Sequence, residues 1–190
     1  MEFNSEGVTI LNGILFGKFF PPHLGHLHCI DFAAQQCAKL FVVVCSSANA
    51  SPSGSERAKW IQQMAPRTEV LLTEDLCDWH FGSSCIAECS NTWAQWLSET
   101  ITERIDIVFS SEEYGPRFAS LINSEHVFVD LSRDFFAISG TQVRLGLSDH
   151  WLDLPEVVRA GLFRKIVILG SESSGTSTLA SDLALALDAP

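Results

Sequence analysis

Residues 14–26 read Ile14-Leu15-Phe16-Gly17-Lys18-Phe19-Phe20-Pro21-Pro22-His23-Leu24-Gly25-His26. The apolar first half predicts a buried strand, and the residues from Gly25 onward predict a helix. His23 and His26 share one face of that helix, at an end whose backbone N–H groups carry a partial positive charge. Gly25 leaves room for a ligand to approach the backbone, and Lys18 lies just upstream. We therefore expect a strand-to-helix junction that holds a polyphosphate.

The composition indicates one domain, or one domain and a fragment. The chain has 190 residues, of which 46% are apolar, with 13 Phe and 5 Trp, so it can bury a sizeable core. Its formal charge of -11 argues against nucleic acid or an anionic membrane as a partner, because both need a basic face. Residues 1–7 show no signal-peptide pattern, and no apolar run is long enough to cross a bilayer. We expect a cytoplasmic protein.

The cysteines are expected to be reduced thiols. Cys29, Cys37 and Cys45 fall in apolar segments, where a thiol behaves as a small hydrophobic group. A metal could in principle be gathered by a second group: Cys77, His80, Cys85 and Cys89. That group lacks a Cys-x-x-Cys pair, so we expect no metal centre in the protein.

Strand and helix signals alternate along the chain. We expect strands at 8–16, 40–45, 69–73, 105–109 and 127–131, and helices at 25–38, 55–64, 92–103 and 115–122. Ser55 is the expected cap of the second helix, and residues 75–90 are expected to form a long functional loop. The alternation predicts an α/β fold: a doubly wound, Rossmann-like parallel five-stranded sheet with helices on both faces. Ligands bind beyond the carboxyl ends of such strands, which brings together His23, Ser110, Ser111 and Ser139.

A second stretch, Ile138-Ser139-Gly140-Thr141-Gln142-Val143-Arg144, also carries phosphate chemistry. Ser139 is a good helix cap, and the guanidinium of Arg144 lies one turn later, where it could grip a phosphate together with the Thr141 hydroxyl. Alone, the stretch fits an ordinary capped helix with a solvated arginine better. With His23 and His26 it becomes half of a bipartite triphosphate site.

Together these stretches resemble the paired signatures of the nucleotidyltransferase superfamily, including its HxGH motif. Within it, the chain is most similar to NadR-type nicotinamide-nucleotide adenylyltransferases, which are fused to a ribosylnicotinamide kinase. The likeness covers nearly the whole chain and includes residues 16–21, 57–63, 91–96 and 108–112. It implies transfer of AMP from ATP to nicotinamide mononucleotide in NAD biosynthesis, giving NAD⁺ and pyrophosphate by direct in-line attack without a covalent intermediate.

The resemblance also implies roles for residues. His23 and His26 would bind the reacting phosphates, Lys18 would hold a phosphate, and Arg144 would hold the β- and γ-phosphates with Ser139 and Thr141. Mg²⁺ would be carried by the ATP phosphates. The wider substrate and nucleotide site would contain Gly17, Phe19, Phe20, Gly25, Arg57, Asn91, Trp93, Ser110, Ser111, Glu112, Ser139 and Thr141.

Two of these residues leave alternatives open. The nicotinamide ring is flat and cationic, so Trp93 beside Asn91 is a candidate to stack on it, and a core position is an equal alternative. Arg57 either faces phosphate or is a solvated surface residue. Trp60, by contrast, is expected in the core.

The C-terminal part predicts a third motif. Residues 165–169 would form a strand, 170–175 a glycine-bounded loop and 178–187 a helix, which is the order of a P-loop. Thr176 stands where the phosphate-binding lysine belongs, so Gly170, Gly175, Thr176 and Ser177 form a degenerate P-loop without kinase activity. We expect an adenylyltransferase domain over 8–150, a connector over 151–163 and a truncated kinase start over 164–190.

Two other functions remain open at this level. The acceptor could be another phosphate ester, such as nicotinate mononucleotide or phosphopantetheine. Alternatively, the chain could be a non-catalytic nucleotide-binding fragment, as the defective P-loop suggests. The pattern is compatible with a homo-oligomer and does not distinguish the amide from the acid form of the base.

Overall fold

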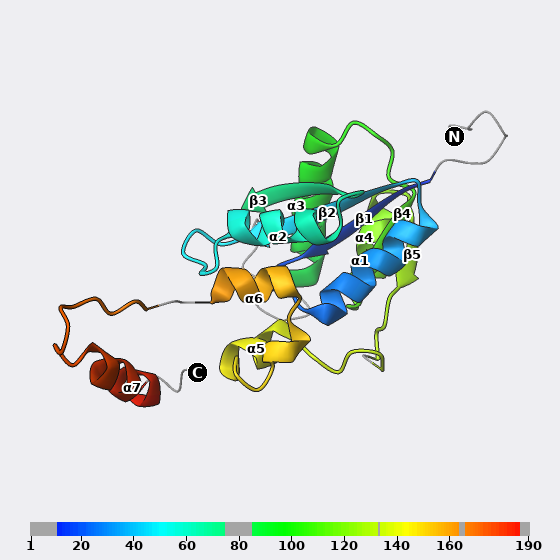
Figure 1. Cartoon of the computed structure of the whole chain (residues 1–190). Helices are drawn as coiled ribbons and strands as arrows, with labels where there is room; N and C mark the ends of the chain where they lie inside the picture. Colours follow the sequence, from blue (N-terminus) through cyan, green and yellow to red (C-terminus); the bar gives the residue numbers. More distant parts are fainter. Residues whose placement is uncertain (1–10, 75–84, 133, 164–165, 187–190) are drawn as a thin grey trace.

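A parallel five-stranded sheet forms the centre of the computed structural model, which describes residues 11–74, 85–132, 134–163 and 166–186. The strands lie in the order β3-β2-β1-β4-β5, and each pairs with its neighbours in parallel (Figure 1). This order is that of a doubly wound sheet, so the predicted fold class is confirmed. The strands are β1 (Asn12–Gly17), β2 (Lys39–Ser46), β3 (Glu69–Glu74), β4 (Ile107–Ser110) and β5 (Glu125–Phe128).

Helices connect the strands and cover both faces of the sheet (Figure 1). The first four are α1 (Leu24–Gln36), α2 (Gly54–Met64), α3 (Cys85–Thr100) and α4 (Gly115–Leu121). After β5 the chain forms α5 (Gly140–Leu145), a 3₁₀ turn η1 (Trp151–Asp153), α6 (Glu156–Leu162) and α7 (Thr176–Ala186).

The side chains of β1 alternate between two cores, as the period of a strand requires. Ile14 and Phe16 pack with α3 and α4, whereas Leu15 packs with α1 and α2. Both faces of β1 are therefore buried, which explains why its sequence is a continuous apolar run. The central position of β1 places its carboxyl end next to that of β4.

Several element boundaries differ from the sequence-based prediction. The cap of α2 is Ser53 rather than Ser55: Ser53 Oγ accepts the Glu56 N–H at 3.3 Å, and a Glu56 carboxylate oxygen accepts the Ser53 N–H at 2.8 Å. This reciprocal pair is a capping box, which needs the glutamate three residues after the cap. The helix α3 begins at Cys85, so part of the expected loop over 75–90 is helical. Residues 8–10 and 75–84 lie outside the described residues.

The segment expected as a connector, 151–163, packs onto the domain. Leu154 and Val158 are buried in a third core cluster with Trp60 of α2 and Val143 of α5. The expectation that Trp60 is a core residue is thus confirmed. A Cβ built on Gly161 would lie 2.3 Å from Trp60 Cζ2, so the indole needs a glycine in α6.

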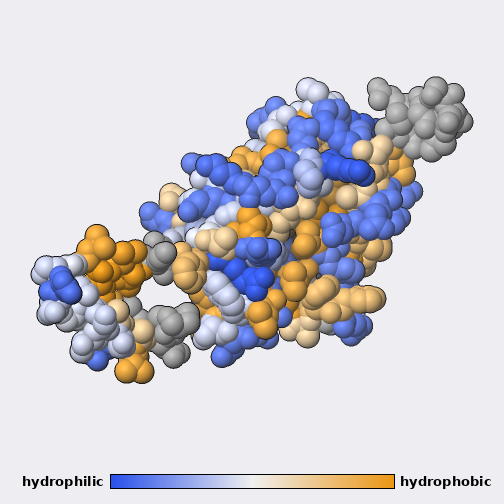
Figure 2. All heavy atoms as spheres, viewed as in Figure 1, coloured by the Kyte–Doolittle hydropathy of each residue, from blue (hydrophilic) through white to orange (hydrophobic). Residues whose placement is uncertain are grey.

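The C-terminal segment differs most from the prediction. Residues 166–170 form no strand, because no described strand lies beside them to pair their backbone groups. Ile166, Val167 and Leu169 are 59, 63 and 87% exposed, and this apolar segment stands apart from the sheet domain (Figures 1 and 2). The helix α7 begins at Thr176, two residues before the expected start. Among the described residues, no helix is both long and apolar enough to span a membrane.

Replacing Gly161 by Leu should destabilise the domain by about 1–3 kcal/mol, because the new side chain overlaps the Trp60 indole. Ala160→Leu is the matched control, since it adds the same side chain at the neighbouring, exposed position of α6. Urea unfolding followed by tryptophan fluorescence measures both. Equal midpoints for the two variants would contradict the packing of α6 on α2.

Candidate active site

A pocket of about 390 Å³ opens at the carboxyl ends of β1 and β4. Here the chain leaves β1 toward β2 on one side and β4 toward β5 on the other, which is where doubly wound sheets bind ligands. The pocket is lined by most of the predicted site residues: Gly17, Lys18, Phe19, Phe20, His23, Gly25, His26, Ser110, Ser111, Glu112, Ser139, Thr141 and Arg144.

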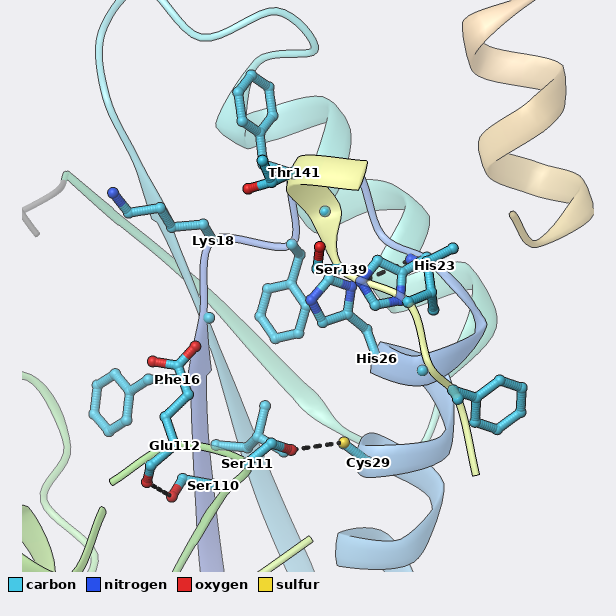
Figure 3. A pocket seen from close by; sticks show the side chains of 18 of the residues that line it. Phe16, Lys18, His23, His26, Cys29, Ser110, Ser111, Glu112, Ser139 and Thr141 are labelled. Carbon is cyan, nitrogen blue, oxygen red and sulfur yellow. Dashed lines mark hydrogen bonds between the residues drawn. The ribbon is translucent and has the colours of Figure 1, made fainter. Parts of the chain in front are cut away.

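His23 and His26 lie together at the start of α1. His23 is the N-cap residue and is 4% exposed, and the two imidazole rings stack with their centroids 3.7 Å apart. His26 Nδ1 accepts the backbone N–H of His23 at 3.2 Å. In the neutral ring the proton of His26 is therefore on Nε2, which can donate to an oxygen. Figure 3 shows both rings next to Ser139, with Lys18 and Glu112 across the pocket.

Gly17 and Gly25 lack side chains, and other side chains of the protein lie close to the space that a Cβ would occupy at these positions. A Cβ on Gly25 would lie 3.1 Å from His23 Nδ1 and 3.2 Å from Phe136 Cβ. A Cβ on Gly17 would lie 2.8 Å from Phe19 Cζ. The prediction that Gly25 leaves space for a ligand is thus corrected: the space above it holds the His23 ring.

Phe19 packs against the imidazole of His26. It has φ of 46°, in the left-handed region that costs a bulky residue free energy, and its ring is 2% exposed. The ring lies edge-on to the His26 imidazole with centroids 5.0 Å apart. Phe19 therefore orients His26 from the end of β1.

The N-terminal end of α5 borders the pocket beside the two histidines. Ser139 is its N-cap, as predicted, and Ser139 Oγ accepts the Gln142 N–H at 3.2 Å. Arg144 donates to the Phe20 carbonyl and, at 3.0 Å, to Thr141 Oγ1. Arg144, which was expected to hold the β- and γ-phosphates, is thus held at the pocket by groups of the protein, with Thr141 exposed beside it.

The third wall follows β4. Ser110 Oγ donates to the Glu112 carbonyl at 2.9 Å, so the loop folds back on itself at the pocket. Ser111 Oγ donates to the Val129 carbonyl at 2.5 Å and lies 3.3 Å from Cys29 Sγ of α1. Figure 3 shows the Ser110–Glu112 bond and the Ser111–Cys29 contact. The hydroxyls therefore fix the wall rather than reach into the cavity.

His126 of β5 stands behind Ser110. Its Nε2 lies 2.9 Å from Ser110 Oγ, and a Cβ on Gly115 would lie 2.1 Å from the same nitrogen. Because the Ser110 proton is directed to the Glu112 carbonyl, Nε2–H of His126 is the donor. Burial lowers the pKa of His126, since the charged ring would lose hydration.

Arg57 was predicted to face phosphate or solvent, and both readings are wrong. Its side chain is 1% exposed and does not line the pocket. The guanidinium donates to the Lys18 carbonyl and, at 2.7 Å, to Ser46 Oγ. Further bonds reach the carbonyls of Cys45, Pro52 and Ser53 at 3.1–3.3 Å. A charge this deep needs such partners, and here they are backbone carbonyls of two loops.

Trp93 and Asn91 also lie away from the pocket. Trp93 is 3% exposed in the core between α3 and the sheet, with its ring 5.3 Å from that of Phe16 and 5.7 Å from that of Trp96. Asn91 is exposed on the outer side of α3. The stacking role for Trp93 is therefore overturned, and its core alternative is the correct one.

Sequence reasoning missed Asp130, Tyr114 and Phe136, which all line the pocket. Asp130 has φ of 49°, and its carboxylate accepts the N–H groups of Asp134 at 2.8 Å and of Phe135 and Phe136 at 3.3 Å. Asp130 falls inside the strand expected over 127–131, and an aspartate there is a turn signal that could have identified this loop. Burial raises the pKa of Tyr114, with the Glu112 carboxylate as a second cause.

The other predicted chemistry lies elsewhere. Within the described residues, no group of three or more His, Cys, Asp or Glu side chains could hold a metal ion. Cys77 and His80 lie outside the described residues. The residues predicted to form a degenerate P-loop, Gly170, Gly175, Thr176 and Ser177, lie in and before α7 and do not line this pocket.

Comparison with known sequences identifies a family and two long relatives. The family model for cytidylyltransferase-like proteins matches residues 14–145. The trifunctional NAD biosynthesis/regulator protein NadR of Escherichia coli K12 is 29% identical over 97% of this chain and 48% of its own length. NadR of Salmonella typhimurium is 28% identical, over 90% of this chain and 45% of its own length. The chain thus spans about half the length of these relatives.

Solved structures share the fold. The crystal structure of a NadR protein in complex with NAD and AMP-PNP matches 96% of this chain and 55% of that chain, with a TM-score of 0.62 at 20% identity. A bifunctional NMN adenylyltransferase/ADP ribose pyrophosphatase from Francisella tularensis, with AMP and manganese, matches 96% of this chain and 57% of that chain, with a TM-score of 0.51 at 16% identity.

Arg57→Lys should lower the free energy of unfolding by about 2–4 kcal/mol, because an ammonium cannot satisfy the carbonyls that the guanidinium fork reaches. Arg67→Lys, at an exposed position after α2, should change it by less than about 0.5 kcal/mol. Guanidinium chloride unfolding measures both. A stable Arg57→Lys protein with weakened nucleotide binding would restore the phosphate role.

His126 should make the domain less stable in acid. The folded state holds the pKa of His126 below its ordinary value, so this contribution is complete above pH of about 6.5 and is lost as the pH falls below it. His126→Gln keeps an N–H donor for Ser110 and removes the titration. Melting temperatures between pH 7.5 and 5 should fall more steeply in the unaltered protein than in the variant, and parallel curves would refute this.

Proposed function

The chain belongs to the cytidylyltransferase-like family, and from this membership we propose that it is an adenylyltransferase that moves AMP from ATP to nicotinamide mononucleotide. The products are NAD⁺ and pyrophosphate. The two NadR relatives are named for NAD biosynthesis, and they support a nucleotidyltransferase of pyridine-nucleotide metabolism.

The observation that carries the proposal is the stacked pair His23 and His26, which lines one pocket together with Ser139 and Arg144. Three hydrogen-bond donors line this pocket: the His26 imidazole, the Lys18 ammonium and the Arg144 guanidinium. A chain with a net charge of -11 has gathered positive and neutral donors here, which suits a polyphosphate.

The reaction needs position and charge more than acid–base chemistry. A phosphate oxygen of the acceptor attacks the α-phosphorus of ATP in line, forming a P–O bond as the bond to the β-phosphate breaks. The attacking oxygen is already ionised at neutral pH, so the site needs no general base. His26 Nε2–H donates to the phosphorus oxygens, and Lys18 and Arg144 neutralise the leaving pyrophosphate.

Mg²⁺ would enter with the nucleotide. The described residues offer no cluster of carboxylates for it, and this donor set fits a metal carried by the ATP phosphates. When bound, the ion neutralises phosphate charge and orients the triphosphate. The protein side of that task falls to Arg144 and Lys18.

The acceptor ring needs an aromatic or apolar face. Trp93 cannot supply it from the core, whereas other aromatic residues line the pocket itself, among them Phe16, Tyr114 and Phe136. These rings favour a flat base over the flexible arm of phosphopantetheine. The two relatives are named for NAD biosynthesis, and this favours the nicotinamide form of the acceptor.

The direct test mixes the protein with ATP, Mg²⁺ and each candidate acceptor, and measures pyrophosphate release. We expect release with nicotinamide mononucleotide, and NAD⁺ as the product by mass spectrometry. Preference for nicotinate mononucleotide or phosphopantetheine would replace the acceptor. Nucleotide binding without release in any mixture would favour a non-catalytic module.

His26→Ala should reduce kcat by about 10²–10³-fold with a small change in the KM for ATP, because Nε2–H acts on charge that develops in the transition state. His28→Ala is the matched control on the same helix; its ring packs against Phe135 and Phe136, with centroids 5.2 and 5.5 Å away. Turnover of the His26 variant equal to that of the control would exclude the proposed role.

A further inference from the structure

Phe20 lies at the junction of three elements. Its ring centroid is 5.0 Å from Cζ of Arg57, which α2 carries, and 4.9 Å from Cζ of Arg144, which α5 carries. Both distances are within the range of cation–π attraction. Phe20 itself belongs to the loop between β1 and α1, so one aromatic ring connects two helices to the loop that carries the histidines.

The backbone of Phe20 makes a second link to α5. Arg144 Nη1 donates to the Phe20 carbonyl oxygen. A Cβ on Gly140 would lie 2.7 Å from the same oxygen, so the first residue of α5 rests against it. Arg57 Nη1 in turn donates to the Lys18 carbonyl, two residues before Phe20. The ring and the backbone carbonyl of Phe20 therefore both contact Arg144 of α5.

The helix α5 depends on such contacts. It has only six residues, and a helix of this length is not stable by itself in water. Arg144 is exposed, and a long surface side chain loses rotamer freedom when it binds a phosphate. A ring and a carbonyl that hold the guanidinium beforehand reduce that loss. Because the guanidinium has five N–H donors, further donors remain for a ligand.

We propose that Phe20 is a positioning residue for the triphosphate: it holds the Arg144 guanidinium at a fixed distance from His23 and His26. This role replaces the expected direct contact of Phe20 with substrate. It rests on the proposed function for the identity of the anion, ATP or pyrophosphate.

The first test compares Phe20→Leu with Phe20→Tyr by calorimetry, with Mg²⁺–ATP and with inorganic pyrophosphate as separate ligands. Phe20→Leu removes the aromatic face at similar size, and we expect it to raise both Kd values about five- to tenfold. Phe20→Tyr keeps the ring and should stay within about twofold. Phe163→Leu, at a 58% exposed phenylalanine after α6, is the matched control and should leave both values unchanged.

The decisive test repeats the change without Arg144. In an Arg144→Ala background, Phe20→Leu should alter either Kd by less than about twofold, because the group that Phe20 positions is gone. The same five- to tenfold effect in both backgrounds would overturn the proposal, as would no effect in the unaltered background. Circular dichroism and melting temperature establish that each variant is folded.

A second variant covers the case in which Phe20→Leu does not fold. Gly140→Ala keeps the ring and pushes α5 away from the Phe20 carbonyl, so it should also raise the Kd for pyrophosphate, and only while Arg144 is present. Binding is measured without turnover. Coupling between Phe20 and Arg144 without pyrophosphate release would therefore refute the proposed reaction and leave the positioning role standing.

Discussion

The guanidinium of Arg57 joins the loop that follows β1 to the loop that follows β2. Its donors reach carbonyls of both loops, from Lys18 on one side and from Cys45, Pro52 and Ser53 on the other. Burying a charge is costly unless its donors are satisfied, so this arrangement tolerates few alternatives. The path of the loop that leads to His23 is fixed by this contact, and the position of the pocket follows from it.

Around that loop, packing between side chains shapes the site as much as polar contacts do. Gly17 and Gly25 give way to the rings of Phe19 and His23, and Phe19 meets the edge of His26. At the border of the pocket, α5 is held by contacts on two sides. Its Val143 is buried with Trp60, Leu154 and Val158, and its first turn rests on the Phe20 carbonyl. The segment after His150 therefore supports the active site, although it lies outside the sheet.

The site residues that sequence reasoning placed well are those next to a strand end or a helix cap. Ser139 capped its helix as expected, because a cap depends on residues within one turn. Arg57 and Trp93 show why other residues were misplaced. The local sequence around an arginine in the first turn of a helix does not show whether a distant carbonyl accepts its hydrogen bond. For Arg57, one such carbonyl belongs to Lys18, 39 residues away. Trp93, Leu97 and Ile101 repeat at the spacing of a core face, and that local signal was a better guide than the nature of the side chain.

The sequence by itself determined the alternation of strands and helices, the parallel sheet and the two stretches that line the pocket, because periodicity and caps are properties of neighbouring residues. Only the tertiary structure decided that Asp130 and Phe136 line the pocket, that Arg57 is internal and that the residues after His150 complete the core. It also decided that residues 166–169 form no strand, although their apolar run is strand-like. A strand requires a partner for its backbone N–H and C=O groups, and a run of residues does not carry that partner with it.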